Sequence, residues 1–343
     1  MSLYFINTIF YMPRRIFTHR EIVFVGPLTK DGGELLDKET AKNILVLGRL
    51  HFVMGGFLLF LLGALFALIS GGDFSLLRFL LGYAVLFPAH LSVSYSNDYF
   101  DSDSDKHNKP TFFTGGSGIL VEHPELKPFA KKFALFLIFL SILLGAVFLF
   151  MFSFPIIFFI FVVFGNTLGW FYAAPPVKLS YRRMGELATV VTAGILLPGM
   201  GYFVMKGVID LFYLLFGIPL MLYGMAFIVG VEIPDMEGDR VGNKKTMVVR
   251  KGRKFGFIIL TLCYILGTLY FFSLSIFLPL ASDYGFFVIG MLSLLPLYLA
   301  FKALFKKPKE RTEAGKLANN SVAALFTFVF LVDIYYLLAV ILA

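Results

Sequence analysis

The sequence predicts an all-α membrane protein with about nine transmembrane helices. Composition is the first observation behind this prediction. Of the 343 residues, 58% are apolar and only 15% are charged, and the mean hydropathy is +0.83. Soluble domains carry about 25% charged residues, so this composition belongs to the membrane class.

The second observation is the length of the apolar runs, because a helix that spans a bilayer needs roughly 20 mostly apolar residues. Pro155 indicates a tight turn between the third run and the fourth. The nine runs cover residues 46–69, 76–97, 130–152, 154–172, 185–205, 211–232, 254–279, 284–304 and 320–342.

The third observation is the distribution of basic residues, which gives the chain a net charge of +8. Of the 30 lysines and arginines, only Arg49, Arg78 and Lys206 lie outside the N-terminal segment and the loops after even-numbered helices. The positive-inside rule therefore places those loops on the cytoplasmic side of the cell membrane. The excess charge reports topology and gives no indication of a nucleic-acid partner.

Residues 1–45 are predicted to form a membrane-surface segment ahead of a transmembrane domain at 46–343. The stretch MPRRIFTHR is too basic and too interrupted for the core of a signal peptide. Cys263 is the single cysteine, which excludes a disulfide within the chain and a cysteine metal site.

Two acidic clusters follow the second and the sixth apolar runs. In the loop sequence NDYFDSDSD, Asn97, Asp101 and Asp105 stand at i, i+4 and i+8, which places them on one face of a helix. In VEIPDMEGD, Asp235 and Asp239 repeat the i, i+4 spacing. Four helices separate the clusters, so both are expected on the same side of the membrane.

Helix stability does not explain these acids, because like charges at i, i+4 repel. Acids close to a membrane core are costly and mark function, and oxygen-only side chains suit a hard cation such as magnesium. A solvated acidic loop is the alternative, and two matched clusters on one side argue against it. A calcium-binding loop that begins at Asp101 would need Gly and Glu where Lys106 and Phe112 stand.

Basic residues surround both clusters. Magnesium together with Lys and Arg is the usual equipment for binding a diphosphate, although each basic residue taken alone is equally consistent with a topology signal or a lipid anchor. The flanking residues are Lys106, Lys109, Arg240, Lys244 and Lys245, and the loop YAAPPVKLSYRR adds Tyr172, Lys178, Arg182 and Arg183.

The two acidic motifs resemble those of the UbiA superfamily of intramembrane prenyltransferases. NDYFDSDSD fits its N-D-x-x-D-x-x-x-D signature, and DMEGD fits its second signature, D-x-x-x-D. The segments YAAPPVKLS, GELATVV and EGDRVGNKKTMVVRKGRKFG look like other loop segments of that superfamily, and the likeness covers roughly residues 45–342. It implies nine helices around a central cavity, two magnesium ions and an isoprenyl diphosphate donor.

The resemblance also implies roles for individual residues. The expected catalytic acids are Asp101, Asp105, Asp235 and Asp239. The expected magnesium ligands are these four with Asn97 and Asp98. The expected diphosphate-binding residues are Arg49, Lys106, Tyr172, Lys178, Arg240, Lys244 and Lys245.

The acceptor is expected to be an aromatic quinone precursor, such as 1,4-dihydroxy-2-naphthoate or 4-hydroxybenzoate. The segments TGGSG and GDRVGNKKTMVVRKG look closest to the branch that prenylates such rings. Glu232 stands where Asn or Asp is common in the superfamily. Prenylation of geranylgeranylglyceryl phosphate for archaeal ether lipids is the alternative, and the haem and chlorophyll branches also remain open.

Functions of other classes would require other features of the sequence. An acid-lined ion transporter would place its binding residues near the midplane, on broken helices related by an inverted repeat. The clusters here lie at helix ends in the same orientation, which favours an enzyme. A phosphatidyl-group transferase would need an upstream D-G-x-x-A-R pattern, which the sequence lacks. A non-catalytic binder of prenyl lipids predicts binding that survives loss of the acids.

Overall fold

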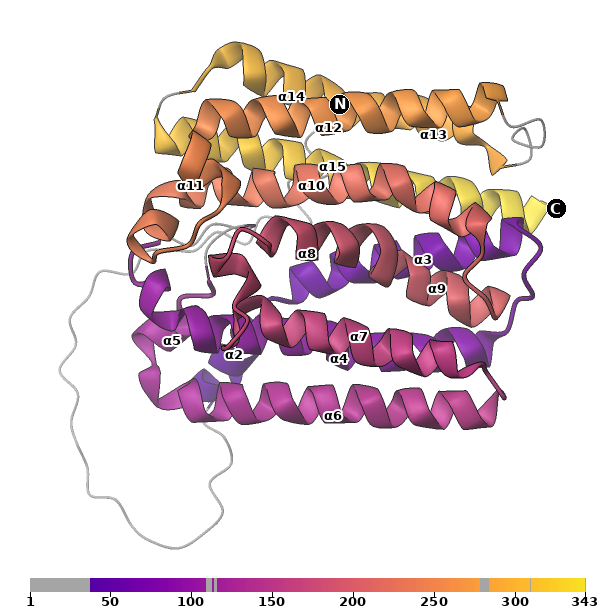
Figure 1. Cartoon of the computed structure of the whole chain (residues 1–343), viewed down its shortest axis with the longest axis horizontal. Coiled ribbons are helices and arrows are strands. Elements are labelled where there is room, and N and C mark those ends of the chain that lie inside the picture. The colour runs from indigo at the N-terminus through magenta and orange to yellow at the C-terminus, as the bar shows by residue number, and fades with distance from the viewer. Residues whose placement is uncertain (1–37, 109–112, 114–115, 278–283, 309, 343) are drawn as a thin grey trace, which may run out of the picture. The chain divides into compact units, whose positions relative to one another are not determined.

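A computed structural model describes residues 38–108, 113, 116–277, 284–308 and 310–342. Within these ranges nine helical segments are long and apolar enough to cross a membrane, which confirms the predicted all-α membrane fold. They are α3 (Leu50–Ile69), α4 (Leu76–Asp105), α6 (Lys127–Met151), α7 (Ile156–Ala173), α8 with α9 (Gly185–Val191, Leu197–Lys206), α10 (Leu211–Val241), α12 (Arg253–Phe277), α13 with α14 (Phe286–Leu292, Leu294–Lys306) and α15 (Arg311–Leu342) (Figure 1).

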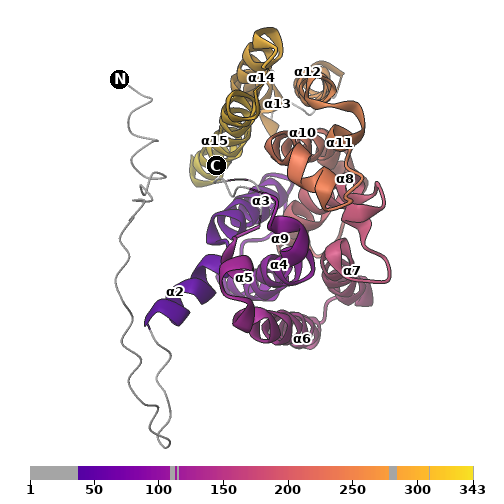
Figure 2. The ribbon, with the colours of Figure 1, turned by 90° about the vertical axis from the view of Figure 1, so that its left-hand side faces the viewer.

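Shorter helices connect these segments. They are α2 (Lys38–Leu47), α5 (Ile119–Glu122) and α11 (Met247–Lys251), with 3₁₀ turns at Pro124–Leu126 and Leu179–Tyr181 and a π-helical turn at Thr192–Leu196 between α8 and α9. In Figure 1, α5 and α11 lie at the same end of the bundle, the end that faces the viewer in Figure 2. Most of the predicted surface segment 1–45 lies outside the described residues.

Three helices are longer than their apolar runs predict. The sequence places ends at residues 97 and 232, but α4 continues to Asp105 and α10 to Val241, and α15 begins at Arg311 rather than at residue 320. The acidic clusters are therefore helical, and their prediction as loops is wrong. A hydropathy scan stops where charges begin, whereas a helix continues as long as its polar side chains find partners or a cavity.

Glycines allow a close approach of α3 and α9. A Cβ atom at Gly63 would overlap the backbone carbonyl of Pro198, and one at Gly201 would overlap the carbonyl of Phe60. In a membrane such small residues let helices gain close packing, because lipid offers no hydrophobic drive for association.

An aromatic cluster fills the bundle at the end remote from the acids. The rings of Phe66 and Phe216 stack at 3.9 Å between centroids, and Phe212, Tyr284 and Phe286 surround them. Such rings bury a large apolar area, so this end of the bundle is tightly packed.

Candidate active site

A cavity of about 370 Å³ lies between α3, α4, α7, α8, α9, α10 and α15. Most of its wall is apolar, with Leu59, Val85 and Leu197 among the lining residues. Most of the acidic residues of α4 and α10 line it too, and they sit toward the C-terminal ends of both helices. The cavity therefore joins an apolar interior to an acidic end.

The first acidic motif lies on the last turns of α4. Asn97, Asp98, Asp101 and Asp105 all line the cavity. For Asn97, Asp101 and Asp105 this agrees with their predicted spacing along one helix face. The backbone N–H of Ser117 donates a hydrogen bond to Asp98 Oδ2 at 3.0 Å. The connection after α4 thus folds back onto the motif.

Gly116 belongs to that connection and packs against the motif. A Cβ atom there would overlap the carboxylate of Asp105. Gly116 therefore lets the backbone approach an acidic side chain closely, which is a typical use of glycine, and a larger residue would displace the Asp105 carboxylate.

The second motif lies on the last turns of α10. Asp235 and Asp239 line the same cavity and are 5% and 6% exposed. A Cβ atom at Gly238 would overlap the side-chain amide of Asn108, which follows α4. This close approach brings the ends of α4 and α10 together.

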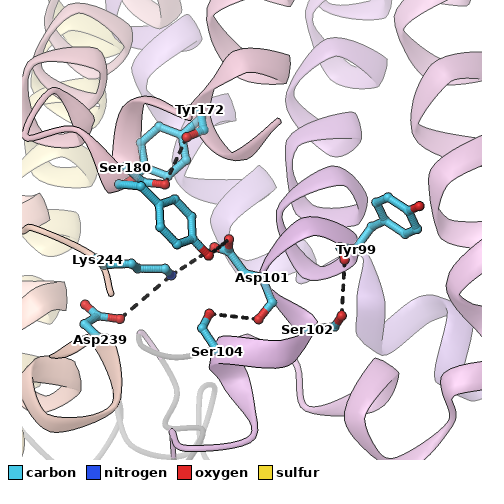
Figure 3. A network of polar contacts seen from close by, with 9 residues as sticks. Tyr99, Asp101, Ser102, Ser104, Tyr172, Ser180, Asp239 and Lys244 are labelled. Carbon is cyan, nitrogen blue, oxygen red and sulfur yellow. Dashed lines mark hydrogen bonds and ion pairs between the residues drawn. The ribbon is translucent and has the colours of Figure 1, made fainter. Parts of the chain in front are cut away.

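Lys244 lies between the two motifs (Figure 3). Its Nζ atom is 2.9 Å from Asp101 Oδ2 and 3.8 Å from Asp239 Oδ1. Burial alone would lower the pKa of Lys244, but the charges of Asp101, Asp239 and Asp105 outweigh it and raise that pKa well above its usual value. Lys244 is thus a largely buried ammonium, with a side chain 14% exposed, that joins the acids of α4 to those of α10.

Tyr181 completes this network. Its hydroxyl donates a hydrogen bond to Asp101 Oδ1 at 2.8 Å. Burial, together with the nearby charge of Asp101, raises the pKa of Tyr181, so the phenol remains a hydrogen-bond donor. Asp101 is held from both sides by Tyr181 and Lys244.

Two further predicted residues line the cavity. Arg49 does so from the start of α3, with its guanidinium 4.4 Å from the ring centroid of Phe52. Tyr172 does so from the last turn of α7, where its backbone carbonyl accepts a hydrogen bond from the Ser180 hydroxyl at 2.9 Å.

Four predicted diphosphate-binding residues do not line the cavity. Lys106 pairs with exposed Asp103 at 2.8 Å, and Lys178 lies 4.8 Å from the ring centroid of Tyr181. Arg240 donates a hydrogen bond to the Val249 carbonyl. The fourth is Lys245, which is exposed. Lys109 lies outside the described residues.

Sequence reasoning gave no role to three residues that join the site. Glu186 of α8 and Glu232 of α10 line the cavity, and each is 6% exposed. The backbone N–H of Met247 donates to Glu186 Oε1 at 2.5 Å. Tyr181 is the third. The position of Glu232 in the sequence could have indicated its place in the site, because it stands one helical turn before Asp235. Glu186 and Tyr181 reach the site only through the fold.

The donor set fits a hard divalent cation. Carboxylate and amide oxygens from α4 and α10 face one cavity, and the side-chain oxygen of Asn97 is buried with no hydrogen-bond partner among the residues that the structure describes. Magnesium prefers such oxygen ligands and retains several waters, so it binds through few protein groups. Among the described residues, no three acidic, histidine or cysteine side chains cluster as a ready-formed cation site.

The described residues thus form a helical membrane bundle around an apolar cavity with an acidic end. A family model described as the UbiA prenyltransferase family matches residues 57–331. The chain belongs to the UbiA prenyltransferase family, and the resemblance read from its motifs is confirmed. It is a prenyltransferase and a multi-pass integral membrane protein.

Individual relatives agree with this assignment. The chain is 25% identical over 283 residues to UbiA prenyltransferase domain-containing protein 1 of Xenopus tropicalis, covering 82% of this chain and 76% of that protein. It is 27% identical over 90 residues to 1,4-dihydroxy-2-naphthoate octaprenyltransferase of Bacillus subtilis (strain 168), covering 26% of this chain and 29% of that enzyme.

A solved structure shows the same fold. The structure of a UbiA homolog from Archaeoglobus fulgidus bound to GPP and Mg²⁺ matches with a TM-score of 0.58 and 16% sequence identity. The match covers 85% of this chain and 99% of that chain.

Proposed function

We propose that the protein transfers a polyprenyl group from an isoprenyl diphosphate to an aromatic quinone precursor, with magnesium as cofactor and pyrophosphate as the second product. One observation carries this proposal: carboxylate side chains far outnumber lysine and arginine side chains at one end of an apolar cavity. The acids that line it are Asp98, Asp101, Asp105, Glu186, Glu232, Asp235 and Asp239, whereas Arg49 and Lys244 are its lining lysines and arginines.

Charge balance explains why the site would take metal and diphosphate together. Buried carboxylates without counter-ions are strongly unfavourable, so this end of the cavity favours bound cations. A diphosphate is attracted only after the acids have been neutralised. Each motif would hold one magnesium ion, and the two ions would supply that neutralisation and offset the charge of the leaving diphosphate.

The chain's own residues then divide the work. Asn97 with Asp98, Asp101 and Asp105 would hold one ion, and Asp235 with Asp239 the other. Arg49, Tyr172 and Lys244 are placed to bind the diphosphate from the cavity wall. The predicted residues outside the cavity, such as Lys178, would reach it only after a loop movement.

The apolar part of the cavity suits the prenyl chain. Breaking the allylic C–O bond leaves positive charge on the prenyl carbon, and aromatic rings stabilise such charge through their faces. Phe52, Phe161, Phe227 and Phe326 line the cavity and exclude water from that cation. The acceptor attacks the cation and gives up a proton, so the bond to the acceptor replaces the bond to diphosphate.

The proposed acceptor class is supported by a sequence likeness. The likeness to the naphthoate prenyltransferase of Bacillus subtilis supports a quinone precursor, although it covers 26% of this chain. The distribution of Lys and Arg supports a site that opens to the cytoplasm.

The test is pyrophosphate release from geranylgeranyl diphosphate by the purified full chain in detergent, with and without magnesium. The acceptors offered are 1,4-dihydroxy-2-naphthoate, 4-hydroxybenzoate and geranylgeranylglyceryl phosphate. We expect magnesium-dependent turnover with one of the two aromatic acceptors. Product from the glyceryl phosphate alone would replace the quinone assignment with the ether-lipid one.

Variants connect the turnover to the site. Asp101→Ala and Asp235→Ala should each lower kcat by about 10²–10³-fold, the usual loss when a group that stabilises transition-state charge is removed. Asp103→Ala is the matched control, because this acid of the same segment has a side chain that is 82% exposed. Donor binding that is independent of magnesium and survives both cavity substitutions would instead support a non-catalytic prenyl-lipid binder.

A further inference from the structure

The sequence of the α10 turn that precedes Asp235 is unfavourable for a helix. Pro234 lacks a backbone N–H and cannot complete the helical hydrogen bond to the carbonyl of Gly230. Gly230 and Gly238 flank it one turn away on each side, and glycine costs a helix about 1 kcal/mol relative to alanine. The helix nevertheless continues through this turn to Val241.

Two arginines from other helices bind the backbone of this turn. Arg253, at the start of α12, donates from Nε to the carbonyl of Ile233 at 3.1 Å. Arg311, at the start of α15, donates from Nε to the carbonyl of Pro234 at 2.9 Å. These are the two carbonyl groups immediately before Asp235.

The arginines reach the turn because glycines bring their helices close to it. Gly256, three residues after Arg253, lies where a Cβ atom would be 3.1 Å from Ile233 Cγ1. Gly315, four residues after Arg311, lies where a Cβ atom would be 3.2 Å from Pro234 Cβ. Each helix therefore pairs an arginine and a glycine against one residue of α10.

A salt bridge adds to the hold on this turn. The guanidinium of Arg253 also pairs with Glu237, which lies between Asp235 and Asp239 in the sequence. Arg253 thus contacts α10 on both sides of Asp235, at a carbonyl before it and at a carboxylate after it. Neither arginine lines the cavity, so neither is placed to touch a substrate.

We propose that Arg253 and Arg311 are positioning residues for the second acidic motif. By binding two successive carbonyls they fix the rotation of α10 at Pro234, and this rotation directs Asp235 and Asp239 into the cavity. The inference rests on the proposed magnesium binding by these acids. Groups that orient metal ligands typically change metal affinity 10–100-fold when they are removed.

A purely structural role is the alternative, in which the arginines only attach α12 and α15 to α10. That role predicts lower thermal stability and an unchanged affinity for metal. Direct metal binding separates the two roles without relying on turnover.

The experiment titrates Mn²⁺, a divalent ion that accepts the same oxygen ligands, into the purified full chain and detects free Mn²⁺ by electron paramagnetic resonance. The variants are Arg311→Ala, Arg311→Lys and Arg253→Lys. Arg78→Ala is the matched control, since this half-buried arginine also donates to a backbone carbonyl, that of Asp73 at 3.0 Å. The lysine variants keep the charge and lose the planar guanidinium, so they serve if the alanine variant does not fold.

We expect one of the two Mn²⁺ sites to weaken by 10–100-fold in the arginine variants, with the other site and the Arg78→Ala control unchanged. Equal Mn²⁺ affinity in all folded variants, with a lower Tm, would overturn the inference and leave a structural role. Failure of the wild-type protein to bind Mn²⁺ would instead contradict the proposed function itself.

Discussion

Lys244 is the residue on which the two acidic motifs meet. Its side chain is 14% exposed and lies within ion-pair distance of one acid from α4 and one from α10. Removal of one partner from a buried ion pair costs about 3–5 kcal/mol, because the other charge is left uncompensated. The stability of this end of the bundle should therefore depend on Lys244 and on bound cations together.

The substitution Lys244→Gln tests this dependence. We expect it to lower the free energy of unfolding by about 3 kcal/mol in EDTA, and we expect magnesium to restore part of the loss because it neutralises the same acids. The measurement is the Tm in detergent with EDTA and with magnesium.

Lys106→Gln is the control for that measurement. Lys106 pairs with Asp103 at the surface, and such exposed pairs contribute less than about 1 kcal/mol. Equal Tm losses in the two variants, or no effect of magnesium on Lys244→Gln, would show that Lys244 does not balance the acids.

At the scale of single elements, helices α4 and α10 matter because they continue beyond their hydrophobic runs. Their extra turns, 98–105 in α4 and 233–241 in α10, carry the acids at a defined rotation. A loop could not hold Asp101 and Asp105 on one face, whereas a helix does so through its 3.6-residue period. The positions of the acids in the site are therefore fixed by the continuation of two membrane helices.

Helices α3 and α9 pack against each other beside the same cavity, and this contact allows a test of packing. Gly201→Ala should lower the free energy of unfolding by about 1–3 kcal/mol, the usual cost of overpacking, because its Cβ atom would meet the Phe60 carbonyl. The measurement is thermal unfolding in detergent. In the control Gly165→Ala, the nearest atom would lie 4.0 Å from the new Cβ atom, and a loss as large as that of Gly201→Ala would contradict the packing argument.

At the scale of the whole molecule, the proposed membrane orientation rests on charge. The loops that carry the basic residues adjoin the acidic end of the cavity, and the positive-inside rule would place both on the cytoplasmic side. Cys263 is buried, which leaves a low background for labelling of introduced cysteines.

We expect Lys106→Cys to resist a membrane-impermeant maleimide in intact cells and to react in inverted vesicles, with Asp73→Cys behaving in the opposite way. Both positions are exposed. Asp73 lies between α3 and α4 and Lys106 follows α4, so the two positions lie at opposite ends of that helix. Labelling of Lys106→Cys from outside the cell would reverse the proposed orientation.

The sequence alone determined the membrane class, the nine helices and the acidic motifs, because apolar runs and residue spacing are local properties of the chain. It also indicated Lys244, through its closeness to Asp239. Only the tertiary structure decided which basic residues face the cavity. Lys178 and Lys245 looked equivalent to Lys244 in sequence, but only Lys244 lies between the acids.

The partners of the motifs were equally beyond the sequence. Tyr181 is 80 positions from Asp101, and Arg311 is 77 positions from Pro234. Contacts over such separations depend on how helices pack, and the packing depends on glycines such as Gly315 whose role appears only when a neighbouring backbone is in place. Spacing along the chain specifies a helix face, whereas the direction of that face and the groups that meet it depend on the assembled bundle.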